Sequence, residues 1–113
     1  MKKGTIVLTP FPFTNLQKSK LRPALVVSQD SDGHDTIFAF ITSQIKEPIS
    51  EVSLLLEVNH PDFKETGLKK ESLLKLDKLV TLEKTILLGR LGRLSDDLML
   101  KVDEKLKIVF DLK

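Results

Sequence analysis

The chain of 113 residues contains no cysteine, and this absence removes several kinds of chemistry at once. A disulfide framework, a thiolate metal site and a cysteine nucleophile are all excluded. The composition suits a reducing compartment, so we expect a cytoplasmic protein. Long hydrophobic runs are also missing, because Pro10 and Pro12 interrupt the apolar stretch near the N-terminus. We therefore predict neither a signal peptide nor a membrane-spanning helix.

The chain is also poor in residues that bind metals or act as paired acids and bases. Its two histidines, His34 and His60, both lie among turn-forming residues, so a two-histidine catalytic pair is not predicted. The segment from Asp30 to Gly33 is similar to the start of a calcium loop, but no glutamate completes it and no helices flank it. We interpret it as a hairpin turn and expect neither a metal nor a cofactor.

Length and charge indicate one small domain with a basic N-terminal part. A chain of this size with 41% hydrophobic residues fits a single domain over residues 1–113. The net charge is only +2, but residues 1–30 carry +4 whereas residues 95–113 carry −1. Lysines of the first loop would attract phosphates in a salt-dependent way without reading bases. The alternative is that the lysines of this first loop are merely solvated and keep the protein soluble.

Short apolar segments bounded by turn formers predict a mainly β protein. The expected strands cover residues 5–9, 24–28, 36–42, 52–58, 72–82 and 86–91. Residues 36–42 are apolar on both faces, so we expect that strand to be covered on both sides. Five to seven short strands of this kind would make a small, strongly bent sheet or barrel.

The C-terminal segment changes from a strand pattern to a helix pattern. Ser95 is placed to cap the helix, and Asp96 and Asp97 complement the positive end of its dipole. The spacing predicts an amphipathic helix packed on the sheet. Its apolar stripe consists of Leu98, Val102, Leu106 and Val109, widened by Met99 and Phe110.

Three polar features interrupt the apolar strands. Pro23 favours an extended backbone at Arg22, so the guanidinium should project from the start of a buried strand, where its planar fork can bind phosphate. Thr42 ends the third strand on the face of Phe38 and Phe40. Lys75 and Asp77 should share a face, about 6–7 Å apart. The alternative for Thr42 is that it is an ordinary β-forming residue at the end of a strand. The alternative for Lys75 and Asp77 is that they are the solvent-facing polar residues of an ordinary alternating strand.

These segments together resemble the MazF/PemK family of toxin endoribonucleases. The matching residues are Gly4-Thr5-Ile6-Val7 with the following phenylalanines, Leu21-Arg22-Pro23-Ala24-Leu25-Val26-Val27, and Ile41-Thr42-Ser43-Gln44. The resemblance implies an SH3-like barrel of the MazF/PemK/CcdB type with a C-terminal helix. It implies catalytic roles for Arg22, Thr42, Lys75 and Asp77. The expected RNA-binding residues are Phe13, Asn15, Lys18, Lys20, Ser43 and Gln44.

The resemblance also implies a mechanism and partners. Such toxins cut single-stranded mRNA at specific sequences without a metal, through attack by the RNA 2′-hydroxyl, and leave 2′,3′-cyclic phosphate and 5′-hydroxyl ends. They are homodimers, a cognate antitoxin silences them, and the toxin–antitoxin complex can bind operator DNA. The chain departs from the family pattern at Lys75, where arginine is common, and at Thr5, where an acidic residue is common. Its first loop lacks the histidine that some members have.

Two alternatives keep the fold but change the function. A CcdB-like toxin would poison DNA gyrase through its C-terminal helix, and a non-catalytic SH3-like module would bind RNA or a protein without cutting. A gyrase poison needs neither Arg22 nor Thr42. The substitution Arg22→Ala therefore distinguishes an endoribonuclease from a gyrase poison, because it should abolish RNA cutting and leave gyrase poisoning untouched.

Overall fold

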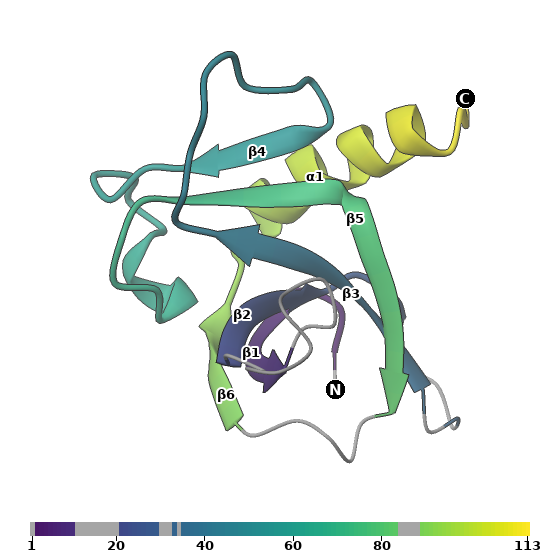
Figure 1. Cartoon of the computed structure of the whole chain (residues 1–113), viewed down its shortest axis with the longest axis horizontal. Coiled ribbons are helices and arrows are strands. Elements are labelled where there is room, and N and C mark those ends of the chain that lie inside the picture. The colour runs from purple at the N-terminus through teal and green to yellow at the C-terminus, as the bar shows by residue number, and fades with distance from the viewer. Residues whose placement is uncertain (1, 11–20, 30–32, 34, 84–88) are drawn as a thin grey trace.

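The computed structural model describes residues 2–10, 21–29, 33, 35–83 and 89–113, and these form one curled antiparallel sheet with a C-terminal helix (Figure 1). The strands are β1 (Thr5–Pro10), β2 (Leu21–Val26), β3 (Asp35–Thr42), β4 (Ser53–Leu56), β5 (Ser72–Glu83) and β6 (Gly89–Arg93). A 3₁₀ turn, η1 (Lys64–Thr66), precedes β5, and the helix α1 covers Asp96–Val109. The strand order is β4-β5-β3-β2-β1-β6. The predicted small bent sheet with a terminal helix is confirmed.

The strand boundaries differ from the sequence prediction most clearly at β2. This strand begins at Leu21, three residues before the predicted start, and Pro23 lies inside it opposite Leu8. A proline is tolerated there because the ladder with β3 begins only at Ala24, which leaves one side of residue 23 outside the ladder. β4 is shorter than the predicted 52–58, and most of the predicted turn at 30–33 lies outside the described residues.

Side chains that alternate along β3 contribute to two hydrophobic clusters on opposite faces of the sheet. The larger cluster includes Ala39 and Ile41 from β3 together with Leu98 and Val102 from α1. The smaller cluster consists of Val7, Ala24, Val26 and Phe38. Both faces of β3 are therefore covered along its middle. Ile37 is an exception to the predicted coverage, because it lies near the start of the strand and is 38% exposed.

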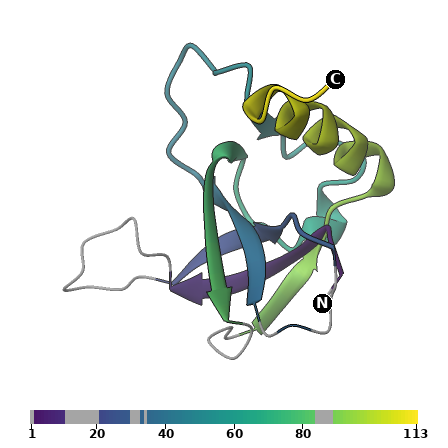
Figure 2. The same ribbon diagram turned by 90° about the vertical axis from the view of Figure 1, so that its right-hand side faces the viewer.

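The helix α1 lies across one side of the curled sheet and packs against β4 and β5 (Figure 2). Ser95 caps it as predicted: its Oγ accepts the N–H of Leu98 at 3.3 Å and donates to Asp62 Oδ2 at 2.7 Å. Phe110 does not widen the buried stripe, because it follows the last helical residue and is 56% exposed. Within the described ranges, no helix is long and apolar enough to cross a membrane.

β5 bends sharply near its middle (Figure 1). Its ladder with β3 pairs Phe40 with Lys75 but Ala39 with Leu79, so residues 76–78 are extra and have no partner in β3. Such a bulge bends a strand and redirects its side chains. The first half of β5 can therefore pair with β4 while the second half continues along β3.

The far edge of the sheet is closed by a very short contact between β6 and η1. A Cβ built on Gly92 would lie 2.3 Å from the carbonyl oxygen of Glu65. Any larger residue at position 92 would push the two backbones apart, so glycine is required there. This contact joins the last strand to the segment that leads into β5.

Candidate active site

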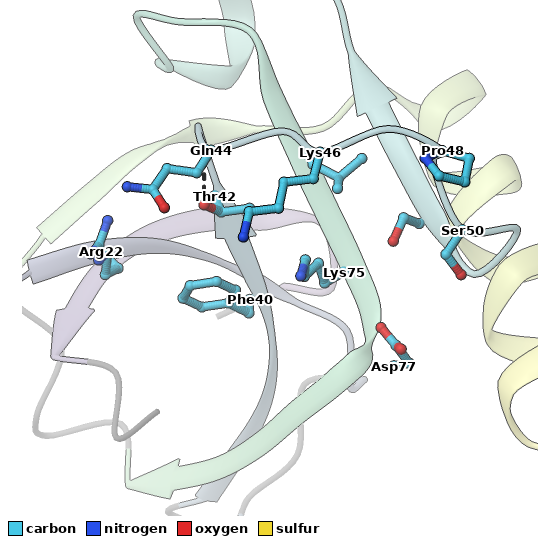
Figure 3. A pocket seen from close by; sticks show the side chains of 11 residues that line it. Arg22, Phe40, Thr42, Gln44, Lys46, Pro48, Ser50, Lys75 and Asp77 are labelled. Atoms are coloured by element: carbon cyan, nitrogen blue, oxygen red, sulfur yellow. Dashed lines mark hydrogen bonds between the residues drawn. The ribbon is translucent and has the colours of Figure 1, made fainter. Parts of the chain in front are cut away.

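A cavity of about 450 Å³ opens on the face of the sheet that carries Phe40 and Thr42 (Figure 3). Its walls come from β2, β3, β4, β5 and the loop of residues 43–52. Elements that are far apart in the sequence therefore meet here. Among its lining residues are five of those that the sequence suggested: Arg22, Thr42, Gln44, Lys75 and Asp77.

Arg22 and Thr42 lie at the same end of the β2–β3 pair. The ladder ends with Ala24 opposite Phe40, and Arg22 and Thr42 each lie two residues beyond that last pair. Both residues line the cavity, so a single phosphate can contact the guanidinium and the hydroxyl together.

The Thr42 hydroxyl is oriented by its own backbone neighbourhood. Its Oγ1 accepts the backbone N–H of Gln44 at 3.1 Å, shown as a dashed line in Figure 3. Thr42 is only 9% exposed, so the bond holds the hydroxyl at the cavity wall. A threonine hydroxyl has one donor proton beside its acceptor sites. Because the backbone bond uses an acceptor site, the proton remains available for an oxygen of a bound ligand.

Four charged side chains line the cavity, and none has an ion-pair or hydrogen-bond partner among the residues that the structure describes. They are Arg22, Lys46, Lys75 and Asp77. The Nε of Arg22 is buried without a hydrogen bond in this part of the chain, and an unsatisfied buried donor costs about 1–3 kcal/mol. A bound anion would accept from this donor. Because three of the four charged side chains are cations, the cavity as a whole also favours anions.

Arg22 and Asp77 stand at opposite ends of the cavity, with Phe40 and Lys75 between them (Figure 3). Lys75 is opposite Phe40 on one side and Ser53 on the other. Asp77 belongs to the bulge of residues 76–78, which lies where β5 bends. Although Lys75 and Asp77 line the same cavity, no ion pair joins them. Each is therefore available to a different part of a bound ligand.

Other residues suggested by the sequence are not brought to this cavity. Ser43 is exposed and does not line it. His60 lies in a turn, as predicted, where its Nδ1 accepts the backbone N–H of Asp62 at 3.0 Å. In the described ranges, no group of three or more metal-binding side chains is close enough together to hold an ion. The remaining suggested residues, Phe13, Asn15, Lys18 and Lys20, lie outside the described residues.

Sequence reasoning missed several lining residues, and part of the signal was present. Every second residue from Phe40 to Ser50 lines the cavity, so the alternation of β3 continues into the following loop. Extending the pattern beyond Thr42 would have found Lys46 and Pro48. Ser53 could not be found in this way, because its place depends on how β4 pairs with β5.

Known structures share this fold over almost the whole chain. An endoribonuclease from a mycobacterial species, solved in complex with its cognate antitoxin, superposes with a TM-score of 0.78 at 17% identity, covering 100% of this chain and 97% of that chain. The Mycobacterium tuberculosis toxin MazF-mt6 gives a TM-score of 0.76 at 18% identity, with coverage of 96% and 98%. A chain of a MazE–MazF complex from Deinococcus radiodurans gives 0.76 at 18% identity, with coverage of 100% and 97%. At these identities the likeness establishes the fold.

Sequence comparison then establishes the family. Endoribonuclease EndoA of Bacillus subtilis (strain 168) is 29% identical over 112 residues, which are 96% of this chain and 92% of that protein. The expected enzyme class, endoribonuclease, is that of this relative and of its family. A family model described as PemK-like, MazF-like toxin of type II toxin-antitoxin system matches residues 2–110. The chain therefore belongs to the PemK-like, MazF-like toxin family of type II toxin–antitoxin systems.

Proposed function

We propose that this chain is a sequence-specific endoribonuclease that cuts single-stranded mRNA without a metal ion. The observation that carries the proposal is that Arg22 and Thr42, from neighbouring strands, line the same basic cavity. Arg22 has no partner in the described part of the chain, and Thr42 has a hydroxyl proton to donate. A phosphate diester satisfies both groups at once.

The reaction uses a nucleophile that belongs to the substrate. The 2′-oxygen forms a bond to the adjacent phosphorus while its proton is removed, and the bond from phosphorus to the 5′-oxygen breaks as that oxygen takes up a proton. Arg22 stabilises the negative charge of the five-coordinate phosphorane, and Thr42 donates to a non-bridging oxygen. Lys75 and Asp77 are the candidates for proton transfer. The products are a 2′,3′-cyclic phosphate and a 5′-hydroxyl.

The charges of the cavity support the proposed metal independence. Arg22, Lys46 and Lys75 supply fixed positive charge where a phosphorane gains negative charge. Single-stranded DNA offers the same phosphates but no 2′-hydroxyl. The cavity should therefore bind DNA without cutting it.

The partners proposed for this chain follow from its family and its charges. A cognate antitoxin would inhibit it by placing an acidic segment over the basic cavity, where the segment folds on binding. We further propose that the toxin is a cytoplasmic homodimer and that its complex with the antitoxin binds operator DNA. Light scattering on a sizing column tests the dimer, and a gel shift with and without antitoxin tests DNA binding.

The direct test is cleavage of a long unstructured RNA by the purified protein in excess chelator, with DNA of the same sequence as the control. We expect discrete RNA fragments with 5′-hydroxyl and 2′,3′-cyclic phosphate ends, and intact DNA. Fragments with 5′-phosphate ends, or cutting that stops in chelator, would contradict the proposed chemistry. Intact RNA across several sequences would instead favour a binding module or a gyrase poison.

A further inference from the structure

We infer that Phe40 and Asp77 form a guanine subsite beside the scissile phosphate, so that the chain cuts next to a guanine. This inference rests on the proposed function, because it concerns the base that enters the same cavity. It assigns Asp77, which lies at the opposite end of the cavity from Arg22, to the base, and this leaves proton transfer to Lys75. Phe40 forms part of the cavity wall, and Asp77 stands at its far end (Figure 3).

Phe40 is placed to stack on a base. It is half-buried and packs on the smaller hydrophobic cluster, yet it also lines a cavity whose other walls are polar and charged. It lies two residues before Thr42 on the same face of β3, a step of about 6–7 Å. A nucleotide with its phosphate at Arg22 and Thr42 therefore brings its base toward the phenylalanine. Unpaired bases commonly stack on aromatic side chains in this way.

Asp77 determines which base edge the cavity accepts. An ionised carboxylate only accepts hydrogen bonds, and this one is exposed and without a partner in the described part of the chain. The bulge that carries it is anchored, because the N–H of Leu76 donates to the carbonyl of Val52 at 3.1 Å. The backbone beside Asp77 is therefore fixed, and its carboxylate lies on the far side of Phe40 from Arg22 (Figure 3).

Guanine is the base that fits these groups. Its N1–H and N2–H₂ are neighbouring donors, and together they match the two oxygens of a carboxylate. Its O6 accepts from Lys75 or Ser53, which lie opposite each other in the β4–β5 register. Adenine and cytosine present an acceptor beside their amino group, and uracil presents its N3–H between two carbonyls. Each of these would place an oxygen or nitrogen lone pair against Asp77.

The test measures cleavage of matched RNA oligonucleotides that differ only at the base next to the cut. A randomised RNA pool first identifies that position from the sequences at the fragment ends. The guanine there is then replaced by inosine, which lacks the N2 amino group, or by adenine. Wild-type protein should cut the guanine substrate about tenfold faster than the inosine substrate, and adenine should be slower still.

The variants separate the two parts of the subsite. Asp77→Asn should cut guanine and inosine substrates at similar rates, because Asn keeps one acceptor for N1–H but presents an amide NH₂ where N2–H₂ needs an acceptor. Phe40→Leu keeps an apolar side chain of similar volume but should slow the guanine substrate about tenfold through lost stacking. The guanine-to-inosine ratio is the readout for Asp77, since a loss of folding or of proton transfer lowers both rates alike.

Failure of this inference is distinguishable from failure of the proposed function. If no RNA is cut, the proposed function itself is wrong. If RNA is cut with no guanine at a fixed position, or if Asp77→Asn leaves the guanine-to-inosine ratio unchanged, the subsite is wrong while the endoribonuclease stands. An unchanged rate in Phe40→Leu would show that Phe40 does not stack on the base and would overturn that half of the subsite.

Discussion

Charged side chains around the cavity and around α1 are arranged in opposite ways. Near α1, Arg93 pairs with Asp96 at 3.2 Å and with Glu65 at 3.6 Å, and Lys3 pairs with Asp103 at 2.7 Å. At the cavity, Arg22 and its charged neighbours have no partners among the described residues.

The difference is the one expected between charges that stabilise the fold and charges kept for a ligand. The pairs near α1 are largely exposed, and exposed pairs contribute at most about 1 kcal/mol each to stability. The cavity gathers positive charge without neutralising it, which favours a bound anion over the empty protein. A chain that kept Arg22 for stability alone would be expected to pair it.

The largest effect is expected when one arginine is removed from each region. Arg22→Ala should lower the rate of RNA cleavage by about 10²–10³-fold, because the phosphorane loses its main charge partner. The free energy of unfolding should not fall, since no pairing in the described part of the chain is lost and an unsatisfied buried donor is removed. The matched control Arg93→Ala, which loses two exposed pairs, should cut RNA normally and lose less than about 2 kcal/mol of stability. The measurements are the RNA cleavage rate and the free energy of unfolding in urea for both variants. Equal losses of cleavage in the two variants would contradict the difference between the regions.

A second prediction concerns the backbone near α1 rather than its ion pairs. Gly92→Ala should lower the free energy of unfolding by about 2–3 kcal/mol, because the new Cβ would lie 2.3 Å from the Glu65 carbonyl oxygen. Gly89 offers a control, since a Cβ there meets nothing within 4 Å. Thermal melts of Gly92→Ala and Gly89→Ala should therefore differ clearly. Equal melting temperatures would show that β6 and η1 do not depend on this contact.

The third prediction tests the hydroxyl of Thr42. Thr42→Val keeps the shape of the side chain but removes the proton donated to the phosphate, so the cleavage rate should fall about 10–100-fold. Thr42→Ser restores a hydroxyl that can accept from Gln44 and should recover most of the rate. Single-turnover kinetics with saturating protein compare the cleavage rates of the wild type and the two variants. Full activity in Thr42→Val would restrict this residue to a structural role.

The smallest expected effect is at the helix cap. Ser95→Ala removes the acceptor for the Leu98 N–H and the donor to Asp62, and should cost about 1 kcal/mol of stability. Ser95→Thr keeps the hydroxyl and should retain most of it. RNA cleavage should be unchanged in both, because Ser95 does not line the cavity. A loss of activity without a loss of stability would mean that the two regions are coupled.

Part of the site could be predicted from the sequence because local rules determine it. Pro23 favours an extended backbone at Arg22, and strand alternation places Thr42 on the face of Phe40. The same alternation puts Lys75 and Asp77 on one side of a strand. The helix was equally accessible, because the spacing of Leu98 and Val102 and the Ser95 cap are local signals.

The rest depends on how distant segments pair. The three extra residues in β5, Asp77 among them, exist only relative to β3, so no local pattern shows them. Ser53 reaches the cavity through the register of β4 with β5. The requirement for glycine at position 92 comes from its contact with Glu65, which is 27 residues away in the chain. The early start of β2 likewise follows from its pairing with β1.

The central claim is that this cavity uses the substrate's own 2′-hydroxyl as nucleophile. The most direct test is an RNA oligonucleotide with one 2′-deoxy residue on the 5′ side of the scissile phosphate, incubated with the protein in chelator beside the all-ribose control. We expect the control to be cut and the substituted bond to stay intact, with binding preserved. Cleavage of the deoxy-substituted bond at an unchanged rate would require another nucleophile and would contradict the mechanism.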